Sequence, residues 1–130
     1  MIKITAESVE VAKVSVRVLR IVGRLTLGEG TSNFRETIRQ ELKNNFKFFA
    51  LDLSGLNYID ASGFGELVSS FTVVNKAGGE TVYFALTKRV LDLFGVAKLC
   101  NYICVKPDEA AALREFEKQP AGGSDSRDLS

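Results

Sequence analysis

Histidine is absent from the 130 residues of this chain. Its absence removes the Ser-His and Cys-His pairs that activate the nucleophile in common hydrolases, and it removes histidine as a ligand of zinc or iron. It also removes the side chain that most often titrates near neutral pH. The common routes to acid–base catalysis are therefore closed; this absence does not by itself exclude an enzyme, but it fits our expectation of a protein that is not one.

Charge of one sign is not in excess either. The chain has 17 Lys and Arg residues against 16 Asp and Glu residues, which gives a formal net charge of +1. Nucleic-acid-binding proteins usually show a basic surplus or stripe, because phosphate contacts dominate their affinity. The mildly basic stretch of Arg17, Arg20 and Arg24 is interpreted as solvated charge on an edge strand. We therefore expect no direct nucleic-acid partner.

Long apolar runs and cysteines are also scarce. No run of about 18 apolar residues is present, and the N-terminus lacks the apolar core of a signal peptide. We therefore expect no membrane span and a cytoplasmic location. The two cysteines, Cys100 and Cys104, would lie roughly 13 Å apart on a strand, which is too far for a disulfide. We expect both to act as small buried hydrophobic residues.

Strand and helix patterns alternate along the chain. Alternating apolar and polar residues over 2–22 predict an antiparallel pair of strands with one wet face. A nearly continuous apolar run over 46–53 predicts a central strand covered on both faces. The remaining predictions are helices at 31–44, 62–77, 88–94 and from Pro107, and strands at 81–86 and 101–105. The first helix would be capped by Thr31 or Ser32.

This alternation is typical of a single α/β domain whose sheet is mainly parallel. The domain is expected to span residues 1–117. Residues 118–130 hold one large apolar residue among Gly, Ser, Asp and Pro, so we expect a disordered C-terminal tail.

The most informative stretch runs from Asp52 to Gly65. The central strand is predicted to end near Leu53, and an Asp-Ala-Ser-Gly-Phe-Gly turn over 60–65 then opens an amphipathic helix. In open α/β sheets, ligands and partners meet the carboxyl ends of the strands, and the N–H groups of a helix start favour negative charge. Gly63 and Gly65 are expected to leave the backbone uncovered, so that another molecule can approach. Ser62 is then placed to be a cap or to be modified.

Four interpretations of the turn compete. In the first, Ser62 is only an N-cap and the glycines only make a turn. A nucleophilic Ser62 would need a glycine two residues earlier, where this chain has Asp60, and it would lack a histidine base. A phosphate-binding or dinucleotide-binding turn would lack the third glycine of its fingerprint. A phosphoaspartate at Asp52 or Asp60 would lack the acidic cluster that holds magnesium.

The residues around this turn resemble the signature of the STAS domain, and more narrowly that of bacterial anti-sigma factor antagonists. The resembling segments are Asp52-Leu53-Ser54, Ile59 to Leu67, Gly78-Gly79, Gly23-Arg24-Leu25 and Lys88 to Phe94. The match covers roughly residues 9–116. The resemblance implies a single α/β STAS-like domain with a mixed, mainly parallel sheet and about four helices packed mostly on one side.

The resemblance also implies partner switching. In this family, the unphosphorylated antagonist binds an anti-sigma factor that has serine kinase activity, and the sigma factor is freed. Phosphorylation of a serine at the helix start releases the antagonist, and a PP2C-type phosphatase resets it. Carried onto this sequence, the phosphorylated residue is Ser62 and its acidic neighbour is Asp60. No cofactor is implied, because the kinase brings ATP and magnesium.

The same resemblance implies that the turn itself binds the partner, through Asp60, Ala61, Ser62, Gly63, Phe64 and Gly65. Ala61 stands where the family often has a first serine, but the acceptor serine is retained. Phe64 replaces the more frequent leucine or isoleucine. The alternatives are a STAS scaffold or transport-complex subunit that is not switched by phosphate, and an enzyme-class site for a small phosphate or nucleotide.

Overall fold

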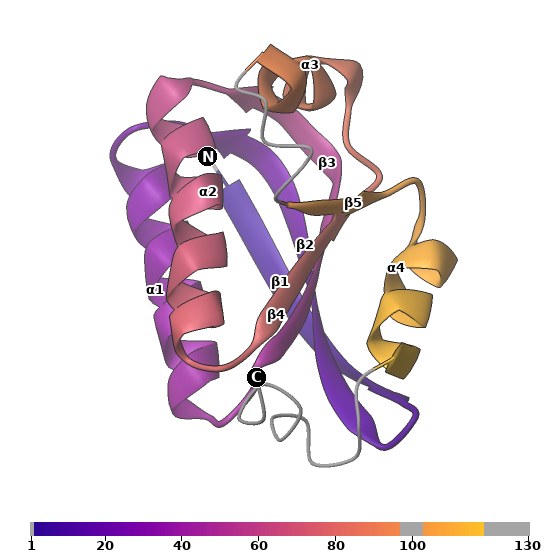
Figure 1. The fold of residues 1–130 in the computed structure, drawn as a ribbon. Helices are drawn as coiled ribbons and strands as arrows, with labels where there is room; N and C mark the ends of the chain where they lie inside the picture. Colours follow the sequence, from indigo (N-terminus) through magenta and orange to yellow (C-terminus); the bar gives the residue numbers. More distant parts are fainter. Residues whose placement is uncertain (1, 97–102, 119–130) are drawn as a thin grey trace.

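A five-stranded sheet forms the centre of the molecule, and the computed structural model describes residues 2–96 and 103–118 (Figure 1). The strands lie in chain order and are β1 (Ile2–Val11), β2 (Val14–Leu25), β3 (Phe48–Ile59), β4 (Glu80–Phe84) and β5 (Cys104–Lys106). β1 pairs antiparallel with β2, and the later pairings are all parallel. The predicted mixed, mainly parallel sheet is confirmed.

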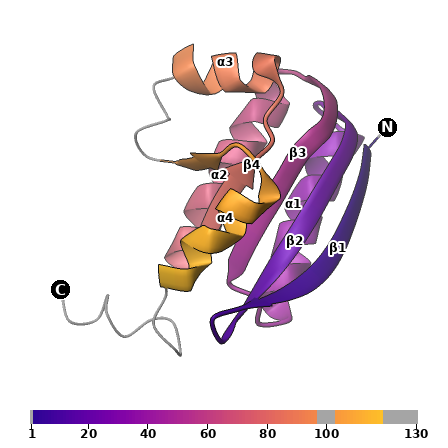
Figure 2. The same cartoon turned by 90° about the vertical axis from the view of Figure 1, so that its right-hand side faces the viewer.

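The helices cover the two faces of the sheet unequally. They are α1 (Glu29–Lys43), α2 (Ala61–Lys76), α3 (Lys88–Val96) and α4 (Glu109–Glu115), with a 3-10 turn η2 (Phe116–Lys118) after α4. α1 and α2 lie side by side on one face, and α4 lies on the other, in front of the sheet in Figure 2. α3 lies at the end of the sheet where α2 begins. The prediction of helices mostly on one side is confirmed.

Residues of β2 contribute alternately to two hydrophobic cores, one on each face of the sheet. Leu19 and Ile21 belong to the core beneath α1 and α2, while Val16 and Val18 belong to the core beneath α4. Successive residues of a strand point to opposite faces, so a strand that is apolar at both parities can be buried on both sides. The second core is closed by Phe116 of η2, which is fully buried.

The antiparallel pair is a tight hairpin, as predicted. Ala12 and Lys13 form its two-residue turn, and their φ angles of 48° and 72° are those of a turn whose twist matches the flanking strands. The register pairs Val11 with Val14. This arrangement makes β1 the edge strand and places β2 inside the sheet.

β3 continues past its expected end at Leu53 to Ile59. Its second half pairs with the end of β2, where Val22 faces Gly55 and Leu25 faces Ile59. A Cβ atom on Gly55 would lie 2.8 Å from a methyl carbon of Val22, so the glycine permits close approach of the strands beside a register shift. The prediction that the strand ends near Leu53 is wrong, because pairing with β2 extends it to Ile59.

Two helices begin differently from the predictions. Gly28, not Thr31 or Ser32, caps α1, and its N–H donates to Thr31 Oγ1 at 3.2 Å. Gly28 has a φ of 107°, which L side chains rarely adopt. α4 is capped by Asp108, whose carboxylate accepts from the Ala111 N–H at 2.9 Å. Its neighbour Pro107 therefore precedes the helix instead of opening it.

Arg17 and Arg20 of β2 are not the solvated edge charges that were expected, whereas Arg24 is exposed. Arg17 donates to Glu41 of α1 at 2.8 Å, and its guanidinium lies 4.5 Å from the centroid of the Phe46 ring. Arg20 is the centre of an ion network, and Arg24 stacks on a ring of β3. Because β2 has a strand on either side, its arginines meet neighbours from other elements.

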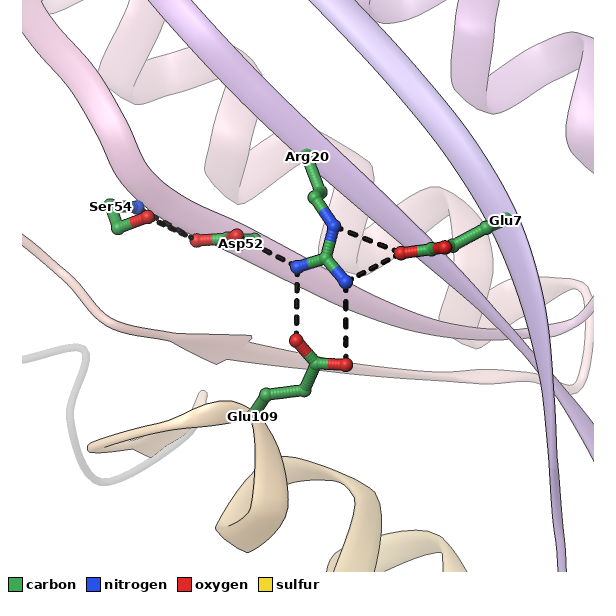
Figure 3. Close-up of polar contacts among 5 residues, drawn as sticks. All are labelled: Glu7, Arg20, Asp52, Ser54 and Glu109. Carbon is green, nitrogen blue, oxygen red and sulfur yellow. Dashed lines mark hydrogen bonds and ion pairs between the residues drawn. The ribbon is translucent and has the colours of Figure 1, made fainter.

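Arg20 joins three carboxylates from three elements (Figure 3). It donates to Glu7 of β1 at 2.9 Å, to Asp52 of β3 at 3.0 Å and to Glu109 of α4 at 2.9 Å. The bonds to Glu109 and Glu7 raise the pKa of Arg20. Partial burial alone would raise the pKa of Asp52, but bonds from Ser54 and Arg20 hold that pKa below its ordinary value. The network therefore fastens α4 and β1 to the middle of the sheet.

Some predictions fall outside the described residues. They are the tail beyond residue 118, residues 101–102 of the last predicted strand, and Cys100. Cys104 lies on β5 and is only half-buried, against the core beneath α4. In the part of the chain that the structure describes, no helix is long and apolar enough to cross a membrane.

Candidate functional site at the start of α2

Asp60 forms the junction between β3 and α2. Its backbone is extended, with φ −103° and ψ −178°, and its Oδ1 accepts from the Gly63 N–H at 2.7 Å. Its Oδ2 accepts from the Leu27 N–H at 3.0 Å, and its own N–H donates to the Leu25 carbonyl at 3.3 Å. The N–H groups of Leu27 and Gly63 lower the pKa of Asp60. One carboxylate thus ties the start of α2 to the segment that leaves β2.

Ser62 is the second residue of α2 and is exposed to solvent. The interpretation of Ser62 as an N-cap is wrong, because Asp60 occupies that position and makes the capping bond. Within residues 2–96 and 103–118, the Ser62 hydroxyl has no hydrogen-bond partner. The turn therefore presents a free hydroxyl at the start of a helix, where the backbone N–H groups favour negative charge.

The two glycines of the turn have different surroundings. Gly63 is buried, and a Cβ atom there would lie 2.0 Å from the Leu25 carbonyl oxygen. The expectation that Gly63 leaves its backbone uncovered is therefore wrong, since β2 already covers it. Gly65 is exposed, and a Cβ atom there would have no neighbour within 4 Å. Of the two glycines, only Gly65 leaves open space for another molecule.

Aromatic packing and one buried hydroxyl anchor α2 behind the turn. The Phe64 ring lies 5.3 Å from the ring of Phe94, which lies 5.8 Å from the ring of Tyr83, both edge to face. The Tyr83 hydroxyl donates to the Leu67 carbonyl at 2.8 Å, and burial raises its pKa. Phe64 and Leu67 therefore hold the helix against β4 and α3. This support positions the exposed residues that precede them.

The structure brings the six predicted site residues into one turn. Ala61, Ser62 and Gly65 are exposed, Asp60 and Phe64 are half-buried, and Gly63 is buried. Sequence reasoning missed Leu27, which is 75% exposed beside Asp60, and Arg89, whose Nη2 donates to the Ile59 carbonyl at 3.5 Å. No sequence pattern indicated that Leu27 and Arg89 belong to the site, because only the fold brings them to this turn.

The chain belongs to the STAS domain family, since the model of that family matches residues 7–112. Three of the solved structures that share the fold show its range. The Bacillus cell fate determinant SpoIIAA in its phosphorylated form has a TM-score of 0.67 at 18% identity, and the match covers 87% of this chain and 99% of the SpoIIAA chain. An anti-sigma factor antagonist from Mycobacterium paratuberculosis has a TM-score of 0.64 at 17% identity, over 87% of this chain and 93% of its own.

The third structure is a membrane protein. It is the murine anion transporter Slc26a9, with a TM-score of 0.65 at 18% identity, and the match covers 84% of this chain but 18% of the transporter. At these identities the likeness establishes the fold alone. The STAS fold is therefore present both in small antagonists and as one part of a transporter.

Proposed function

We propose that this protein is an anti-sigma factor antagonist that acts by partner switching. Its unphosphorylated form binds an anti-sigma factor with serine kinase activity and so frees a sigma factor. The kinase phosphorylates Ser62, the antagonist is released, and a PP2C-type phosphatase restores the unmodified form. In this role the chain is a substrate and a docking surface in the cytoplasm, with no catalytic step of its own.

The exposed, unengaged hydroxyl of Ser62 carries this proposal. Asp60 already caps α2, so the Ser62 hydroxyl makes no capping hydrogen bond among the described residues. A kinase can therefore take the hydroxyl without breaking an internal bond. The likeness to named antagonists over nearly the whole of their chains supports the same function.

The physical effect of the phosphate follows from its position. Phosphorylation adds about −1.5 to −2 charges at pH 7, and the N–H groups of a helix start tolerate that charge. Within the antagonist the cost is small, but a partner packed on Ala61, Ser62 and Gly65 would have no room for it. About 1.4 kcal/mol of penalty on the partner side lowers the affinity tenfold.

The test is phosphorylation by a serine kinase of the histidine-kinase-like ATPase fold from the same genome. Incubation with that kinase and ATP should add one phosphate to Ser62, located by mass spectrometry. Ser62→Ala should abolish the modification, whereas Ser69→Ala, which alters another exposed serine of α2, should leave it intact. Phosphate on a different residue, or on the Ser62→Ala variant, would contradict the proposal.

The likeness to part of Slc26a9 favours one alternative, a STAS module of a transport complex that is never phosphorylated. In that case Ser62→Asp should leave the affinity for the partner unchanged, because no charge switch operates at the turn. A loss of affinity of about tenfold or more on Ser62→Asp would favour the antagonist. Calorimetric titration of both forms with the same partner distinguishes the two functions.

A further inference from the structure

Two arginines share one tyrosine ring beside the turn. Arg24 at the end of β2 pairs in register with Tyr58 of β3, and its guanidinium carbon lies 4.5 Å from the centroid of the Tyr58 ring. The guanidinium carbon of Arg89, from α3, lies 5.4 Å from the same centroid. Both arginines are exposed, and Tyr58 is 38% exposed. We call these three residues the arginine–tyrosine patch.

The positive charge of this patch is not neutralised within the described residues. In residues 2–96 and 103–118, neither Arg24 nor Arg89 has a carboxylate within 4.0 Å, whereas Arg17, Arg20, Arg35 and Arg39 are all in ion pairs. Two carboxylates close in sequence to Tyr58 and Arg89 make other contacts. Asp60 accepts from backbone N–H groups, and Asp92 pairs with Lys88 at 3.2 Å. Two like charges are therefore held together without a counter-ion.

The patch borders the turn that presents Ser62. The carbonyl of Leu25, the residue after Arg24, lies against Gly63, and one residue, Ile59, separates Tyr58 from Asp60. The carbonyl of Ile59 accepts from Arg89. In Figure 1, α3 lies at the end of the sheet where β3 leads into α2. A protein that packs on the turn and extends over this end of the sheet would also cover the patch.

The chemistry of the arginine–tyrosine patch favours contacts with carboxylates. A guanidinium stacked on a ring is already oriented, so it loses little side-chain entropy when it binds, and its planar fork matches a carboxylate. Tyrosine and arginine are also enriched among the residues that dominate interface energies. We propose that the arginine–tyrosine patch binds carboxylate side chains of the protein that docks on the Ser62 turn. This inference rests on the proposed function and adds that the partner presents an acidic surface there.

An acidic partner surface gives the phosphate switch a second physical cause. Phosphate on Ser62 would stand beside the partner's carboxylates, and like charges at an interface oppose binding. The phosphate therefore adds electrostatic repulsion to the loss of space. Salt would weaken the unmodified complex, because screening reduces the attraction between the patch and the carboxylates.

The first experiment compares variants in calorimetric titrations with the anti-sigma factor kinase. Arg24→Ala/Arg89→Ala should lower the affinity about tenfold or more and flatten its dependence on salt. Arg114→Ala is the matched control, since Arg114 is exposed in the last turn of α4 and has no ion pair within the described residues. Its affinity should equal that of the wild type. Phosphorylation of Ser62 together with undiminished binding by the double variant would overturn this inference and leave the proposed function standing.

The second experiment does not depend on the kinase. A synthetic peptide of alternating glutamate and glycine is titrated into the labelled chain, and the Nε–Hε resonances of the arginines are followed by NMR. The resonances of Arg24 and Arg89 should shift, that of Arg114 should not, and a lysine–glycine peptide should shift none of them. Equal shifts at all three arginines, or none, would refute the patch as a carboxylate site. If only Arg24 and Arg89 shift, and the kinase test finds no phosphate on Ser62, the carboxylate-binding site is supported and the proposed function is rejected.

Discussion

Gly63 and Gly65 look equivalent in sequence, but the folded chain uses them differently. Gly63 lies against the backbone of β2, at a place where a side chain would meet a carbonyl group that cannot rotate away. Gly65 lies two residues further along α2, and a Cβ atom there would have no neighbour within 4 Å. The first glycine therefore serves the packing of the turn, and the second leaves its surface open.

Gly63→Ala should consequently destabilise the protein, while Gly65→Ala should not. The new methyl group at position 63 would force β2 and α2 apart, and such overpacking costs about 1–3 kcal/mol or more. At position 65, alanine should raise the free energy of unfolding by up to about 1 kcal/mol, because it favours a helix over glycine. Urea unfolding of the two variants measures both effects. Equal stability of the two would contradict the close approach at Gly63.

Asp60 should make stability depend on pH at the acidic end. Two backbone N–H groups lower its folded pKa below the 3.8 of the unfolded chain. Its contribution is therefore complete above that value and is lost as pH falls through the folded pKa, where the unfolded state binds more protons. Asp60→Asn should retain much of the cap, since asparagine is a good N-cap, but lose this part of the pH dependence. Urea unfolding midpoints from neutral to acidic pH test this, and an unchanged slope in the variant would contradict it.

At the scale of elements, β3 shows which part of a strand a local sequence pattern predicts and which part it does not. The apolar run over 46–53 predicted the first half of β3, because such a pattern reflects burial of the residues themselves. The extension of β3 to Ile59 depends on pairing with β2, which no local pattern reveals. The Arg20 network likewise gathers residues that are far apart in sequence.

The Arg20 network should matter more through Arg20 than through Glu109. Removing Arg20 leaves Asp52, whose side chain is 14% exposed, without its cation, whereas the Glu109 side chain is 38% exposed. Arg20→Met should cost about 1–3 kcal/mol, because a half-buried carboxylate loses a charged hydrogen bond. Glu109→Gln should cost less than about 1 kcal/mol, as solvated ion pairs do. Chemical unfolding gives both values, and a larger loss for Glu109→Gln would reverse this order.

At the scale of the whole molecule, the site is separate from both cores. The first core supports α2 from behind through Leu67, and the second core lies across the sheet beneath α4. The exposed hydroxyl of Ser62 belongs to neither. A modification at this position can therefore change what the surface binds without unfolding the domain.

Ser62→Asp should leave the fold intact while mimicking the added charge. A negative charge in the first turn of a helix stabilises it by about 0.3–1 kcal/mol, and the carboxylate of Asp60 opposes part of that gain. The free energy of unfolding should therefore change by less than about 1 kcal/mol. Circular dichroism and urea unfolding provide the check, with Ser62→Ala as the uncharged control. Loss of cooperative unfolding in Ser62→Asp alone would show that the site is not independent of the cores.

The sequence by itself determined the α/β class, the helix that starts after Asp60, and the resemblance that singles out Ser62. These follow from the periodicity of apolar residues and from a contiguous motif, which are local properties of the chain. Only the tertiary structure decided that the Asp60 carboxylate also binds the Leu27 N–H, that Gly63 is covered by β2, and that Arg24 and Arg89 meet on Tyr58. Those relations join segments distant in sequence, and they arise from the parallel pairing of β2 with β3 and from the placement of α3 at the end of the sheet.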